Sequence, residues 1–132
     1  MNEFDHEKLD VYVAAIDFVA LADQIVEHLP RGRAYLADQM QRAATSIPLN
    51  IAEGAGEFSA SEKARFYRMA KRSATESAAI VHVCQRLGLV EDARYNAGRE
   101  LLLRIVAMLV KMVRHTGDPG TGTGTGSGSE RK

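Results

Sequence analysis

The sequence has little of what several protein classes need. Its 132 residues include no tryptophan, three prolines and 6% aromatic residues, and its formal net charge is zero. A single cysteine, Cys84, excludes a disulfide framework within the chain. Zero net charge means that no overall basic field draws the protein onto nucleic acid or a membrane surface. No apolar run approaches the length of a membrane span, and the acidic residues 1–10 lack the features of a signal peptide, so we expect a cytoplasmic protein.

Helical periodicity dominates the first 116 residues. Apolar residues recur at intervals of three and four, and alternation with period two is absent. This spacing predicts four helices, with breaks at residues 29–32, at Gly54 and Gly56, and at Gly88. The third helix is predicted to begin at Ser59, because the spacing of Ser59 and Glu62 matches a capping box.

Four stripes of apolar or small residues are predicted to face one core. By segment they are Leu9, Val13, Ile16, Val19, Ala20, Val26 and Leu29; Leu36, Met40, Ala43, Ile47 and Ile51; Phe66, Ala70, Ser77, Val81 and Cys84; and Gly98, Leu102, Ile105, Leu109 and Met112. Amphipathic helices with short connections specify an all-α, up-down-up-down antiparallel four-helix bundle over residues 1–116. Residues 117–132, rich in Gly and Thr, have no apolar side chain to anchor them and are predicted to be a flexible low-complexity tail.

A proline, Pro48, lies inside the second helical segment. Its missing N–H leaves the carbonyl of Ala44 without the usual partner, so we expect a kink or a local bulge. Hydroxyl and amide side chains nearby can satisfy the freed backbone groups: Thr45, Ser46 and Asn50. A polar stripe, offset from the core-facing one, comprises Gln39, Arg42, Ser46, Asn50 and Glu53. Two roles are open for this stripe: repair of the bent backbone, or contact with another molecule.

Two stretches of the sequence resemble a known family. The first covers residues 4–12, and the second covers residues 42–54 with the pattern Ser-Ile-Pro-x-Asn-Ile-Ala-Glu-Gly. The matching positions of the second stretch are Arg42, Ala43, Ala44, Ser46, Ile47, Pro48, Asn50, Ile51, Ala52, Glu53 and Gly54. Residues 86–88 fit the pattern too. Over about residues 3–115, the chain resembles the 23S rRNA intervening-sequence proteins, a family of small bacterial four-helix-bundle proteins.

The resemblance implies a four-helix bundle whose subunits assemble into a ring, typically a homopentamer. It therefore suggests that Arg42, Ser46, Pro48, Asn50, Glu53 and Gly54 form an oligomer interface or a structural motif. Some members of the family are encoded inside intervening sequences of 23S rRNA genes, and many stand alone. A related branch serves diversity-generating retroelements as a basic accessory protein that binds nucleic acid and a reverse transcriptase. The zero net charge of this chain differs from that branch.

Charge is unevenly distributed along the chain. Residues 1–28 hold seven acidic side chains and one lysine, whereas residues 58–88 hold six basic and two acidic side chains. Arg65, Arg68 and Arg72 share one stripe of the third helix, which makes them candidates for contact with RNA or DNA phosphates. The alternatives are a solvated face, or pairing with the acidic first helix of the same or a neighbouring subunit.

The patterns that mark catalytic and metal sites are missing from the sequence. Gly54 and Gly56 lack the Lys-Ser/Thr of a phosphate-binding loop. No two histidines, and no histidine and cysteine, are spaced four residues apart, so we predict no metal and no cofactor. Cys84 is predicted to be a buried structural thiol. We therefore predict a non-enzymatic homo-oligomer that serves as an interaction or assembly module, without membrane or small-molecule ligand; the alternative is an RNA- or DNA-binding accessory protein.

Overall fold

The computed structural model describes residues 3–117. Its elements are a short 3-10 helix, η1 (Asp5–Lys8), and four α-helices: α1 (Asp10–Glu27), α2 (Ala34–Ala55), α3 (Ala60–Arg86) and α4 (Asp92–Arg114). Residues 3–117 contain no strand, which confirms the predicted all-α class. The predicted tail lies outside the described residues, apart from Gly117.

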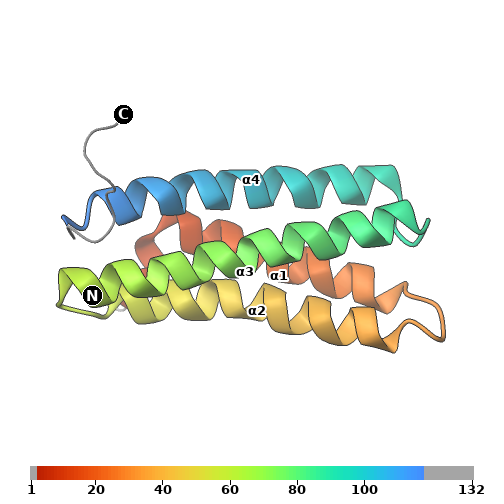
Figure 1. Cartoon of the computed structure of the whole chain (residues 1–132), viewed down its shortest axis with the longest axis horizontal. Helices are drawn as coiled ribbons and strands as arrows, with labels where there is room; N and C mark the ends of the chain where they lie inside the picture. Colours follow the sequence, from red (N-terminus) through yellow and green to blue (C-terminus); the bar gives the residue numbers. More distant parts are fainter. Residues whose placement is uncertain (1–2, 118–132) are drawn as a thin grey trace.

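The helices form the expected up-down-up-down bundle. Figure 1 shows neighbouring helices running in opposite directions, with the α1–α2 and α3–α4 connections at one end and the α2–α3 connection at the other. Each of α1 and α3 packs against both α2 and α4, so α1 and α3 occupy opposite corners. Since short connections place consecutive helices side by side, this order follows from the loop lengths.

The helix ends follow the local sequence signals, with one difference. Ser59 caps α3, because its Oγ accepts a hydrogen bond from the Glu62 N–H at 3.3 Å. The Glu62 carboxylate pairs with Arg65 rather than returning to the Ser59 backbone, so only half of the predicted capping box forms. Gly88 ends α3 with a φ of +74°, the left-handed conformation that favours glycine after a helix.

Three of the four predicted core stripes are confirmed in large part. In α2 all five predicted residues are buried; in α3 and α4 only Phe66 and Met112 are partly exposed. The stripe predicted for the first segment was right only in part: Leu9, Val19, Val26 and Leu29 are partly buried and pack against the core, whereas Val13, Ile16 and Ala20 do not. Val13 and Ile16 are 52% and 43% exposed, and Ala20 is exposed as well. The fully buried residues of α1, none of which was in the predicted stripe, are Val11, Ala14, Ala15, Phe18, Ala22 and Ile25.

The error in α1 has a physical cause. Apolar residues surround this helix on nearly every side between positions 11 and 22, so spacing alone admits two stripes. Packing selects the stripe that contains Phe18. A Cβ at Gly98 of α4 would lie 3.6 Å from Phe18 Cε1 and 3.2 Å from Leu21 Cδ2, so the absence of a side chain at Gly98 leaves room for these two. Val13, Ile16 and Ala20, which belong to the other stripe, face outward.

The core contains one buried polar side chain, Ser77, and its substitution tests the packing. Ser77 is fully buried, and its Oγ has no hydrogen-bond partner among residues 3–117. Since burying an unsatisfied hydroxyl costs about 1–3 kcal/mol, Ser77→Ala should raise the free energy of unfolding by about 1 kcal/mol after the small loss of packing. Urea denaturation measures this change. Ser73→Ala is the matched control and should lower stability, because Ser73 Oγ has a partner 2.8 Å away. A loss of stability in Ser77→Ala would contradict the prediction.

Candidate functional site: a polar notch between α2 and α3

Three polar side chains join α2 to α3 beside Pro48. Ser46 Oγ of α2 lies 2.8 Å from Ser73 Oγ of α3. Asn50 Nδ2 donates to the Ser46 backbone oxygen at 2.9 Å and to Ser46 Oγ at 3.0 Å. All three residues are partly buried. Ser46 and Asn50, which the sequence placed on a polar stripe, therefore turn toward the neighbouring helix of the same chain.

These residues line one side of a shallow hollow, the polar notch, of about 250 Å³. Its lining residues are Ser46, Asn50, Met69, Arg72, Ser73 and Glu76. The notch brings together residues from both predicted sets, since Ser46 and Asn50 belong to the proline motif and Arg72 to the basic stripe. Arg72 and Glu76 are exposed and supply opposite charges to the wall of the notch.

Pro48 is buried, and α2 continues through it to Ala55. The predicted repair of the Ala44 carbonyl does not occur through the side chains that we named. Thr45 Oγ1 donates to the carbonyl of Gln41 at 2.8 Å, and the Asn50 amide reaches the carbonyl of Ser46. These bonds keep the side chains against the helix, where Ser and Thr hydroxyls often back-bond to the preceding turn.

The last residue of the motif, Gly54, allows α2 and α3 to approach closely. A Cβ at this position would lie 2.6 Å from Tyr67 Cε1 and 3.2 Å from Phe66 Cβ. Lys63 Nζ, also from α3, donates to the Gly54 carbonyl at 2.9 Å and to the Ala55 carbonyl at 3.3 Å. A cation is favourable at this point because the C-terminal carbonyls of a helix carry partial negative charge.

Arg42 and Glu53 do not join this network. Arg42 forms a surface ion pair with Asp38 at 3.1 Å, and Glu53 is exposed. The structure thus divides the predicted set: Ser46, Asn50 and Gly54 lie at or near the α2–α3 contact, Pro48 is buried on another side of α2, and Arg42 and Glu53 face outward. An interface role for the outward pair stays a prediction.

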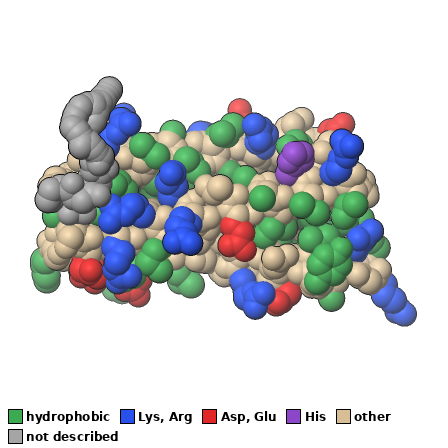
Figure 2. All heavy atoms as spheres, viewed as in Figure 1, with side chains coloured by type: hydrophobic (Ala, Val, Ile, Leu, Met, Phe, Trp, Pro, Cys, Tyr) green, Lys and Arg blue, Asp and Glu red, His purple; other side chains and the backbone are tan. Residues whose placement is uncertain are grey.

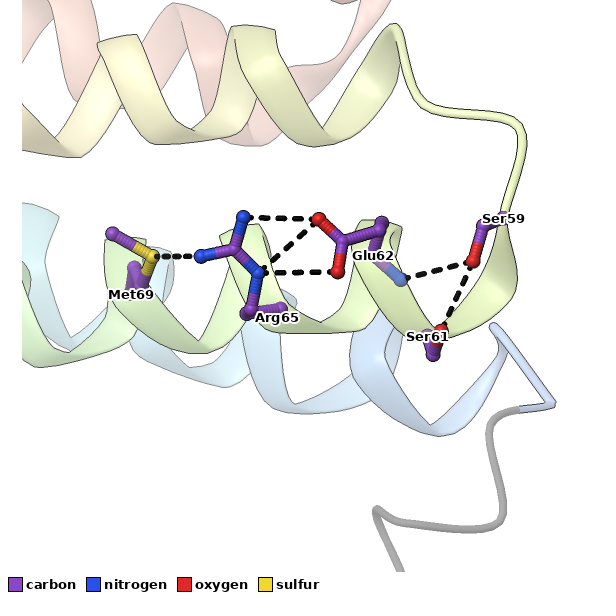
Figure 3. Close-up of polar contacts among 5 residues, drawn as sticks. All are labelled: Ser59, Ser61, Glu62, Arg65 and Met69. Carbon is purple, nitrogen blue, oxygen red and sulfur yellow. Dashed lines mark hydrogen bonds and ion pairs between the residues drawn. The ribbon is translucent and has the colours of Figure 1, made fainter.

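The basic stripe on α3 is partly occupied by contacts within the helix. Arg65 donates from Nη2 to Glu62 Oε1 at 2.9 Å and contacts Met69 Sδ at 3.5 Å (Figure 3). Its guanidinium carbon also lies 4.4 Å from the centre of the Phe66 ring. The hydrogen bond with Arg65 lowers the pKa of Glu62, and the same bond raises the pKa of Arg65. Phosphate would have to compete with these contacts.

Arg68 is half-buried and Arg72 is exposed. Lys and Arg side chains gather over the first half of α3 in Figure 2, so the basic surface itself is present. Whether it contacts nucleic acid stays a prediction.

Sequence reasoning missed two residues that complete the α2–α3 contact, Ser73 and Lys63. Ser73 lies on the side of α3 that faces α2. The signal in the sequence was a small polar residue seven positions before the apolar Ile80, and therefore on the same side of the helix. In the sequence, Lys63 is recognisable only as one of the six basic residues between positions 58 and 88. Its role depends on where the C-terminus of α2 lies in space, and the local sequence of α3 carries no information about that.

The notch shows no arrangement typical of catalysis. Ser46 Oγ bonds to Ser73 Oγ and accepts a hydrogen bond from the Asn50 amide, and none of these three groups is a general base; the carboxylate that lines the notch, Glu76, is exposed. Residues 3–117 contain no cluster of three or more His, Cys, Asp or Glu that could hold a metal ion. Cys84 is buried as predicted, and desolvation raises the pKa of its thiol. Among the described helices, each is too short or too polar to cross a membrane.

The fold and the notch define a small four-helix-bundle protein in which a Ser-Ile-Pro-x-Asn-Ile-Ala-Glu-Gly motif helps to join two helices. The family model for the 23S rRNA-intervening sequence protein matches residues 7–111, and the chain belongs to this family. No curated protein matches the chain.

The close approach at Gly54 can be tested with a neighbouring glycine as control. Gly54→Ala should lower the free energy of unfolding by about 1–3 kcal/mol, because the new methyl group would overlap the Tyr67 ring. Gly56→Ala should have little effect or stabilise slightly. The nearest atoms to its Cβ are 3.7 Å away, and its backbone is already right-handed helical. Chemical denaturation of both variants gives the comparison, and equal effects would contradict the packing role of Gly54.

Proposed function

We propose that this protein is a non-catalytic homo-oligomer, a ring of about five copies that acts as an interaction or assembly module. The observation that carries the proposal is the outward stripe of α1, formed by Val13, Ile16 and Ala20. These side chains are exposed in the single chain, on a face of α1 that also carries the exposed Asp17 and Gln24. Val13 and Ile16 are large apolar side chains exposed to water, and a second copy of the chain would cover them.

The family resemblance supports five as the number of copies. The resemblance suggested that the polar motif forms an oligomer interface, but Ser46 and Asn50 make their hydrogen bonds within the chain. We propose that they fix the α2–α3 contact inside each subunit. A subunit with a defined shape can present the same face repeatedly, as a closed ring requires.

Light scattering coupled to size exclusion tests the assembly. The expected mass is near five times 14.4 kDa, at protein concentrations of tens of micromolar, on the order of the dissociation constants of moderate complexes. The mass should persist at high salt if apolar burial dominates the contact, because salt screens charge pairs but strengthens rather than weakens apolar contacts. A monodisperse monomer under both conditions would refute the proposal.

A further inference from the structure

The outward face of α4 carries a second apolar stripe that matches the one on α1. Leu103, Val106 and Val110 follow each other at the same intervals, three and then four residues, as Val13, Ile16 and Ala20. Leu103 is 59% exposed, and Val106 and Val110 are half-buried, with Val106 also packed against the core of its own subunit. Two stripes with the same spacing extend over the same length of helix, so they can lie along one another.

The charges around the two stripes are opposite. α1 contains four acidic residues and no basic one: Asp10, Asp17, Asp23 and Glu27, all of them exposed. α4 contains five basic and two acidic residues, and Arg99 and Arg114 stand one turn before and one turn after its apolar stripe. Like charges would face each other if α1 met α1 or α4 met α4, whereas α1 against α4 pairs opposite charges.

We propose that the outward face of α1 in one copy docks on the outward face of α4 in a second copy of this chain. The inference rests on the proposed homo-oligomer and specifies which surfaces meet. Such a contact joins two different patches, so each copy has one face of each kind to offer. α1 and α4 are neighbouring corners of the bundle, so successive copies are rotated by the angle between the two faces. When these rotations complete a full turn, a ring closes.

A groove beside α1 suits the α4 face. It lies between α1 and α2 and holds about 300 Å³; its lining is half apolar (Val19, Ala22, Ala44) and half polar (Asp23, Gln41, Thr45). An aliphatic side chain between positive charges complements such a groove. Leu103 meets this description, since Arg99 and Arg104 lie four residues before it and one after it. Apolar contact and charge pairing would thus reinforce each other at one place.

Single substitutions on each face test the contact. Ile16→Lys introduces a charge at the centre of the α1 stripe and Leu103→Glu replaces the most exposed residue of the α4 stripe with a charge, so each variant should lose the oligomer and elute as a monomer. Leu49→Glu is the matched control, because Leu49 is 65% exposed but lies on α2 outside both stripes. This variant should keep the wild-type mass. Circular dichroism and thermal unfolding show whether each variant folds.

The double variant Asp17→Lys, Asp23→Lys leaves every buried residue unchanged and should also dissociate.

Mixing the two monomeric variants provides the decisive result. The Leu103→Glu copy keeps an intact α1 face and the Ile16→Lys copy keeps an intact α4 face, so the two variants should form a complex that contains them in a one-to-one ratio. Light scattering at concentrations on the order of 100 µM would detect it. Absence of this complex would overturn the inference. The inference would also be overturned if the folded Ile16→Lys and Leu103→Glu variants kept the mass of the wild-type oligomer, although the proposed oligomer would then remain supported. A wild-type protein that is itself monomeric would instead refute the proposed function.

Discussion

Small residues on α2 allow it to lie close against α3. Gly54 leaves space for the Tyr67 ring, and Ser46 reaches Ser73 Oγ across the contact at 2.8 Å. Residues longer than these would push the helices apart, and the Lys63 hydrogen bonds to the end of α2 would be lost with them. The position of α3 in turn sets the position of α4, which packs against it. The shape of the subunit therefore depends on this contact.

Charge divides the same bundle into two halves. α1 and α2 together carry more acidic than basic side chains, and α3 and α4 carry more basic than acidic ones. Because the totals cancel, net charge conceals this division. In the proposed oligomer, this division would favour one orientation of a second copy, with the acidic half of one subunit against the basic half of the next. The pairing of Arg65 with Glu62 within α3 further reduces the positive charge available to a phosphate.

The candidate site shows how a conspicuous motif can serve packing rather than chemistry. Pro48 removes one backbone donor, and the residues around it make their hydrogen bonds to nearby carbonyls and to Ser73. The proposed function consequently lies on other surfaces, at the outward stripes of α1 and α4, which neither the motif nor the family match identifies.

The sequence by itself determined the all-α class, the number of helices, their order and most of their ends, because periodicity, capping residues and Gly88 act locally. It also determined the core stripes of α2, α3 and α4, where one face is clearly more apolar than the others. It did not separate the two apolar stripes of α1 between positions 11 and 22, although Asp17 in that stretch lies on the exposed face. Only the tertiary structure decided this, by placing Phe18 where Gly98 leaves room. The partners of Ser46, Asn50 and Lys63 were decided in the same way, because each depends on residues that the chain brings together only when the bundle forms.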